Sequence, residues 1–163
     1  MEKFRKEILK FLERHGNVDL EELGVLLGVS GAEVANEVAT LEKEGIICGY
    51  HTVINWDSAG VDKVNALIEV RVTPQRNEGF DKIARRISNY REVSSVYLIS
   101  GAFDLLITIE GKTLLEVSRF VSERLSPLED IVSTSTHFIL KKYKDFGTCM
   151  EVPNKDERML VTP

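Results

Sequence analysis

"VSGAEVANEVATLEKEGII", residues 29–47, decides the fold of the first part of the chain. Three apolar residues recur there at the spacing of one helix face: Val34, Val38 and Leu41. Ser30 followed by Glu33 matches the capping box S-x-x-E, in which each side chain satisfies a backbone N–H group of the other residue. The stretch therefore predicts a helix that begins just after Ser30 and ends near Gly45.

Two helical patterns precede this one. The first has an inward-facing stripe and ends near Gly16; the stripe is Phe4, Ile8, Phe11 and Leu12. The second begins after Asp19, which is suited to cap it, and turns inward Leu20, Leu23 and Leu27. A tight turn at residues 28–30 then leads into the third helix. Three helices with a glycine turn before the last indicate a helix-turn-helix, whose last helix enters the DNA major groove.

The segment after the third helix indicates β structure. "IICGYHTVINW", residues 46–56, predicts a small wing around Gly49 and then a strand leaving the domain. The polar break "DSAG" at residues 57–60 is the predicted boundary. We therefore expect a winged helix-turn-helix over residues 1–56 and a linker over residues 57–63.

The second half alternates between the strand period and the helix period. In "VNALIEVRV", residues 64–72, every second side chain is apolar, which predicts a strand with one buried face. Further strands are expected at 93–100, 103–111 and 131–143, and helices at 78–90 and 113–125. The helix at 113–125 is expected to turn inward Leu114, Val117, Phe120 and Val121. The order β-α-β-β-α-β predicts a ferredoxin-like domain over residues 64–143, with a tail at 144–163, so the fold class is α+β.

Such a sheet carries both helices on one face and leaves the other face to be covered. Leu67 and the Ser/Thr-rich strand at 131–143 indicate that a partner subunit covers it. We therefore expect a homodimer or a higher even-numbered oligomer.

Composition and charge exclude several classes of protein. The net charge is −5, and residues 1–60 alone hold six bases against eleven acids, which is unusual for a binder of nucleic acid. No apolar run approaches the ~20 residues of a membrane span, and no leader follows Met1. The two cysteines lie far apart, and neither they nor the three scattered histidines have metal-ligand spacing. We expect a cytoplasmic protein that is no enzyme and holds no metal and no cofactor.

Together, the two halves resemble the Lrp/AsnC, or feast-famine, family of regulators. The resemblance covers roughly residues 3–142 and rests chiefly on "VATLEKEGIICGYHTVIN" (38–55), "REVSSVYLISGAFDLLITIEG" (91–111) and "STSTHFILKK" (133–142). It implies a dimeric or larger transcription factor. The N-terminal domain of such a factor binds a palindromic site on double-stranded DNA. Its C-terminal domain binds a small effector, usually an amino acid, between subunits.

The resemblance implies that the third helix and the wing contact DNA. The expected contact residues are Ser30, Ala32, Glu33, Asn36, Glu37, Thr40, Lys43 and His51. Among them, Asn36 suits the adenine edge and Glu37 the cytosine amino group. Relatives usually open this helix with Ser-Pro-Ser and expose an arginine, whereas here Gly31 follows Ser30 and no base precedes Lys43. A basic stripe on the first helix is expected to supply phosphate contacts: Lys6, Lys10 and Arg14.

The effector is expected at the hairpin "SGAFD", residues 100–104. Backbone N–H groups near Gly101 suit an α-carboxylate, and Asp104 suits an α-ammonium group. The expected effector residues are Ser100, Gly101, Ala102, Asp104, Thr134 and Thr136. Gly and Asp are also ordinary turn residues, so a purely structural role for this hairpin is an open alternative.

Two readings of the acidic third helix remain open. In the first, Glu33 serves as a cap, the other acids are solvated surface, and the protein regulates transcription. In the second, the protein is a ligand-sensing oligomer that no longer binds DNA and acts on a protein partner. An enzymatic role like that of the sirohaem decarboxylases, which share this layout, lacks support because their His-Asn-Tyr-x-Arg run is missing.

Overall fold

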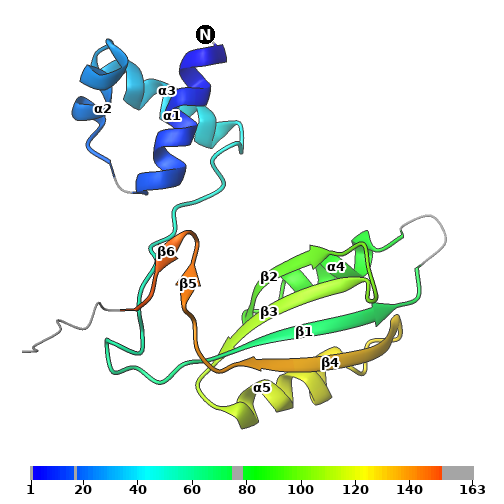
Figure 1. The fold of residues 1–163 in the computed structure, drawn as a ribbon. Coiled ribbons are helices and arrows are strands. Elements are labelled where there is room, and N and C mark those ends of the chain that lie inside the picture. The colour runs from blue at the N-terminus through cyan, green and yellow to red at the C-terminus, as the bar shows by residue number, and fades with distance from the viewer. Residues whose placement is uncertain (1, 17, 75–78, 152–163) are drawn as a thin grey trace, which may run out of the picture. The chain divides into compact units, whose positions relative to one another are not determined.

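The computed structural model describes residues 2–16, 18–74 and 79–151. The chain divides into two compact units, residues 1–54 and 55–163. The first unit holds helices α1 (Glu2–His15), α2 (Leu20–Leu27) and α3 (Gly31–Lys43) (Figure 1). Its buried core is Ile8, Leu23, Val34, Val38 and Leu41. The predicted helix-turn-helix is therefore confirmed, with the expected residues inside.

Local chemistry sets the ends of these helices. Asp19 accepts a hydrogen bond from the backbone N–H of Glu21 at 2.9 Å and so caps α2 as predicted. Gly28 and Gly45 each end a helix in the left-handed backbone region, with φ of 71°. This conformation costs glycine little because it has no Cβ. The tight turn between α2 and α3 follows from the first of these two glycines.

The predicted wing and strand over residues 46–56 are wrong. The described residues between α3 and β1 (Val64–Val72) contain no strand, and Ile46 and Tyr50 are 50% and 58% exposed. A strand exists only where a neighbouring strand takes up its backbone N–H and C=O groups. Alternating apolar residues cannot supply that neighbour, and no strand among the described residues pairs with the segment.

The second unit has the predicted β-α-β-β-α-β order. After β1 come α4 (Asp81–Ser88), β2 (Val93–Leu98), β3 (Leu105–Gly111), α5 (Leu114–Phe120), its π-helical continuation η1 (Val121–Leu125) and β4 (Ile131–Ile139). The strands lie in the order β2-β3-β1-β4, and every neighbouring pair is antiparallel (Figure 1). The ferredoxin-like prediction is confirmed. Residue 78, the expected start of the first helix here, lies outside the described residues.

The core of this unit lies on one face of the sheet. Inward strand residues pack with residues from both helices, and the buried set from β1 is Ala66, Ile68, Val70 and Val72. The ring of Phe120 meets the ring of Tyr90 edge to face, with centroids 5.5 Å apart. The opposite face carries the alternate residues, including Leu67, Leu106 and Tyr97. Among the described residues of this unit, the helices therefore cover one face of the sheet and nothing covers the other.

Two details differ from the prediction. Leu114 was expected inside but is 57% exposed. It is the first residue of α5, three positions after β3 ends at Gly111. The fourth strand ends at Ile139, because its partner β1 begins at Val64 and the register pairs Asn65 with Ile139. A small hairpin of β5 (Lys144–Asp145) and β6 (Thr148–Cys149) follows instead.

Candidate functional site

The outward side of α3 carries a stripe without acids. Its buried side is formed by Gly31, Val34, Val38 and Leu41. The exposed residues opposite them are Ala32, Asn36, Ala39, Thr40 and Lys43. The Thr40 hydroxyl donates to the backbone carbonyl oxygen of Asn36 at 2.8 Å, and the side chains of both residues are exposed. We call these five residues the reading stripe; Ala39 was not among the predicted contacts.

Glu33 lies at the start of α3 and belongs to its cap. Its backbone N–H donates to the Ser30 hydroxyl at 3.2 Å, and its carboxylate accepts from the Ser30 N–H at 3.0 Å and from the Ser30 hydroxyl at 2.8 Å. The predicted capping box is confirmed. The hydrogen bond from the Ser30 backbone, followed by that from its hydroxyl, holds the pKa of Glu33 below its ordinary value.

Glu37 and Glu44 are engaged by one residue of α1. The guanidinium of Arg5 places Nε 2.7 Å from a Glu37 carboxylate oxygen and a terminal nitrogen 2.5 Å from a Glu44 carboxylate oxygen. The hydrogen bond with Glu44, ahead of the attraction of both carboxylates, raises the pKa of Arg5. Glu37 is therefore turned toward α1 in this structure rather than toward a DNA base. Arg5 was not recognised in the sequence.

Glu42 is the fourth acid, on the other flank of α3. Its carboxylate accepts a hydrogen bond from the Tyr50 hydroxyl at 2.7 Å, which raises the pKa of Tyr50. All four acids of the quoted stretch thus have a partner inside the first unit. The acidic side chains of this stretch form a helix cap or contacts along the flanks of α3. The reading stripe itself contains no acid, and its last residue is a cation, Lys43.

The departure at Gly31 has a local explanation. Gly31 is buried, and the carboxylate of Glu21 from α2 occupies the space that a side chain at residue 31 would need. A carboxylate is favourable there because it lies at the positive end of the α3 dipole. The glycine therefore makes room for an acid that stabilises the helix start.

The predicted cations lie outside the α3 stripe. Lys6, Lys10 and Arg14 are exposed along α1. His51 is exposed in the segment after α3, which is not a wing strand. These positions can reach phosphate only if DNA extends over α1 and this segment as well as α3.

The predicted effector hairpin is held together by Asp104. Its backbone N–H donates to the Val70 carbonyl oxygen at 3.0 Å, and its carboxylate accepts from the Val72 N–H at 2.9 Å. Its carbonyl oxygen accepts from the Ile99 N–H at 2.8 Å, which closes the loop. One carboxylate oxygen of Asp104 thus supports β1, at the register shift between Arg71 and Val72. Ser100, Gly101 and Ala102 are exposed at the tip.

The two threonines of the predicted effector set lie elsewhere in the chain. Thr134 pairs with Val70 and Thr136 with Ile68, so both are on the helix-covered side of β4. The strand β1 separates them from Asp104, and two strand spacings amount to about 10 Å. The Thr134 hydroxyl lies 3.4 Å from that of Ser126. A single chain therefore does not bring the six predicted residues into one pocket.

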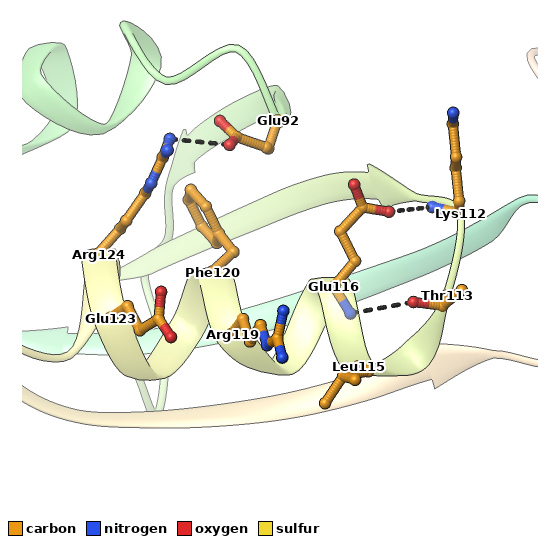
Figure 2. Close-up of a pocket in the computed structure, with 9 residues that line it drawn as sticks. All are labelled: Glu92, Lys112, Thr113, Leu115, Glu116, Arg119, Phe120, Glu123 and Arg124. Carbon is orange, nitrogen blue, oxygen red and sulfur yellow. Dashed lines mark hydrogen bonds and ion pairs between the residues drawn. The ribbon is translucent and has the colours of Figure 1, made fainter.

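A shallow cleft lies beside α5 and η1 and extends to Glu92, in the segment before β2 (Figure 2). Its volume is about 420 Å³, and an ion pair of 2.8 Å between Arg124 and Glu92 crosses one end. At the other end, Glu116 accepts from the backbone N–H of Lys112 at 2.7 Å (Figure 2). None of the predicted site residues lines this cleft.

Two searches of the described residues bear on other kinds of site. No three His, Cys, Asp or Glu side chains gather there into a possible metal site. No helix in the described part of the chain is both long and apolar enough to cross a membrane.

Comparison with known proteins matches both halves of the chain. Residues 65–148 match the family model of the Lrp/AsnC ligand binding domain. The uncharacterized HTH-type transcriptional regulator YugG of Bacillus subtilis is 45% identical over 158 residues, covering 96% of this chain and 95% of the relative. The proline dehydrogenase transcriptional activator of Rhizobium radiobacter is 26% identical and covers 90% of this chain and 94% of its own.

Solved structures share the fold. The transcriptional regulator NMB0573 of Neisseria meningitidis, solved in complex with L-Met, superposes with a TM-score of 0.69 at 22% identity, covering 89% of this chain and 93% of that chain. AsnC of E. coli gives a TM-score of 0.63 at 19% identity, covering 87% of this chain and 93% of its own. With the domain match and the relative from Bacillus subtilis, these findings show that the chain belongs to the Lrp/AsnC family of transcriptional regulators.

Proposed function

We propose that this protein is a sequence-specific DNA-binding regulator of transcription that reads its operator through the reading stripe of α3. The observation that carries the proposal is the engagement of all four acids of the helix by capping or by flanking partners. The outward stripe is consequently free of negative charge. It can approach DNA although the first part of the chain is acidic.

The stripe suits direct reading of A·T pairs. The Asn36 side-chain NH2 group can donate to N7 of adenine while its carbonyl oxygen accepts from the N6 amino group, in a bidentate contact. The methyl groups of Ala32, Ala39 and Thr40 can contact the C5 methyl of thymine. Lys43, at the end of the helix, can reach a phosphate. Base reading thus comes from α3, and most of the electrostatic grip comes from α1.

The expected DNA affinity of a single N-terminal domain is low. Few cations face outward, so few counterions leave the DNA on binding and the salt dependence is shallow. Two or more heads in one assembly raise the effective concentration and recover useful affinity. For this reason we expect the affinity of the protein for DNA to depend on oligomer formation.

We propose that the open face of the sheet forms the dimer contact. It combines apolar side chains with polar pairs, in a face that nothing in the described chain covers. His137 lies 3.4 Å from Glu69 and 3.3 Å from Ser135, and the Ser95 and Thr108 hydroxyl groups contact each other. Tyr97 on the same face is 52% exposed. A second copy of the chain that stacked its own open face on this one would bury these side chains between the two sheets.

We propose further that an amino acid binds at the 100–104 hairpin and is completed by a neighbouring subunit. The hairpin and the Thr134–Thr136 segment lie on different sides of β1 in one chain, so they can share a ligand only across a subunit contact. The complex of the Neisseria meningitidis regulator with L-Met supports an amino acid as ligand. In this arrangement the ligand changes assembly, and assembly changes DNA affinity.

The test is a titration of the purified full-length protein on DNA from its own promoter and on a shuffled fragment of equal composition. It is run at several salt concentrations, with and without a mixture of amino acids. Saturable preference for the promoter, weakened by salt and shifted by the mixture, supports the regulator. Equal binding to both fragments contradicts it and favours the ligand sensor that acts on a protein partner.

A further inference from the structure

Arg5 occupies an unusual position in the first unit. It follows Phe4, which packs against the core, and its side chain crosses from α1 to the flank of α3. The Arg5, Glu37 and Glu44 side chains are 30%, 20% and 44% exposed, so the cluster is half withdrawn from water. The two acids are seven residues apart, with Glu37 inside α3 and Glu44 as the residue that caps its C-terminal end. A single planar guanidinium bridges them because its donors point in several directions.

The bridged acids adjoin the reading stripe. Glu37 follows Asn36, and Glu44 follows Lys43. A helix that lies in the major groove brings its flanks close to the phosphates that line the groove walls. Free carboxylates at these two positions would meet that negative charge. The contact with Arg5 both turns them toward α1 and offsets one of their two charges.

We propose that Arg5 is a positioning residue for DNA binding, which holds Glu37 and Glu44 away from the phosphates so that the reading stripe can enter the groove. This inference rests on the proposed function. We expect Arg5 itself to make no phosphate contact, because two of its three guanidinium nitrogens already face the two carboxylates. The net effect of losing this single cation is the release of two acids beside the DNA.

The experiment measures binding of the full-length protein to its promoter fragment by fluorescence anisotropy at several salt concentrations. The variants are Arg5→Gln, the pair Glu37→Gln with Glu44→Gln, and the triple variant that combines all three changes. Lys10→Gln is the matched control, since it removes an exposed cation from the same helix. Circular dichroism and thermal unfolding of each variant report the fold.

Arg5→Gln is expected to weaken binding by about tenfold through like-charge repulsion, and the triple variant is expected to regain affinity close to that of the original protein. Salt screens this repulsion, so the loss in Arg5→Gln is expected to be largest at low salt. Lys10→Gln is expected to lower the salt slope by about one phosphate contact. A triple variant as weak as Arg5→Gln overturns the proposal, because Arg5 would then act by itself. A loss of affinity in Arg5→Gln that is the same at every salt concentration does so too, because repulsion between charges must weaken as salt is added.

Arg5→Lys covers the case in which Arg5→Gln fails to fold. Lysine keeps the charge but, as a point charge, cannot bridge both acids. Weaker DNA binding by a folded Arg5→Lys protein supports the positioning role, and unchanged binding overturns it. If the original protein shows no promoter preference, the proposed function fails. If it shows the preference and Arg5→Gln binds equally well, only this inference fails.

Discussion

Gly24 of α2 lies directly against the backbone of Gly31 at the start of α3. A methyl group on Gly24 would lie 2.8 Å from the Gly31 nitrogen and 2.9 Å from the Val29 carbonyl oxygen. Backbone atoms cannot move aside as a flexible side chain can, so the two helices approach this closely only because residue 24 has no side chain. The orientation of α3 relative to α2 therefore depends on that contact.

Gly24→Ala is therefore expected to destabilise the protein, although alanine is the better helix former. Overpacking of this kind costs about 1–3 kcal/mol. The measurement is chemical denaturation followed by circular dichroism. Gly49→Ala is the control, because no atom lies within 4 Å of the position of its added methyl group. Equal stability of the two variants would show that the α2–α3 contact is looser than described.

Asp104 separates a structural role from an effector role. Asp104→Ala removes the carboxylate that accepts from the Val72 N–H. Leaving this backbone donor unpaired is expected to lower the stability of the fold by about 1–3 kcal/mol. Asp104→Asn keeps an acceptor oxygen and is expected to retain most of the stability, but to lose its response to amino acids if the charge holds an α-ammonium group. Thermal unfolding with and without amino acids measures both effects. An Asp104→Asn variant with a full amino-acid response would limit Asp104 to the hairpin.

The sequence predicted the parts of the molecule that depend on local chemistry. The capping box at Ser30, the cap at Asp19 and the alternation in β1 each need only residues a few positions apart. Arg5 was missed because its partners are far away in sequence, Glu44 by 39 positions. The signal that could have found it is its place beside the Phe4–Ile8 stripe, next to an unusually acidic helix. The prediction of a wing was wrong for a related reason, because a strand requires a neighbouring strand that its own sequence does not supply.

The capping box makes the stability of α3 depend on pH. The pKa of Glu33 is lowered in the folded state, so its stabilising effect is present above the ordinary glutamate value of 4.5 and is lost as the pH falls through the lower folded value. The melting temperature of Glu33→Ala is therefore expected to lie below that of the original protein at pH 7. The gap between them should narrow in the acid range below pH 4.5. A gap that stays constant over this range would mean that the carboxylate charge does not matter.

Leu67 tests the proposed dimer contact. It lies on the open face of the sheet, half-buried, opposite His137 and Thr108 in the neighbouring strands. Leu67→Lys puts a charge where a second sheet would stack, and burying an unpaired charge is costly. Light scattering after size-exclusion chromatography is expected to show monomers. Leu115→Lys, on the exposed side of α5, is the control and is expected to leave the assembly intact. If Leu115→Lys gave monomers and Leu67→Lys did not, the subunit contact would lie on the α5 side and the proposed contact would be wrong.

Asn36 tests the central claim most directly, because it is the residue of the reading stripe best suited to specify a base. The measurement compares the affinities of the original protein and Asn36→Ala for the promoter fragment and for its shuffled counterpart, at one salt concentration. A bidentate contact to adenine contributes about 1–3 kcal/mol of discrimination. We therefore expect Asn36→Ala to lose most of the preference for the promoter and to bind shuffled DNA as before. An unchanged preference in Asn36→Ala would contradict reading by this stripe.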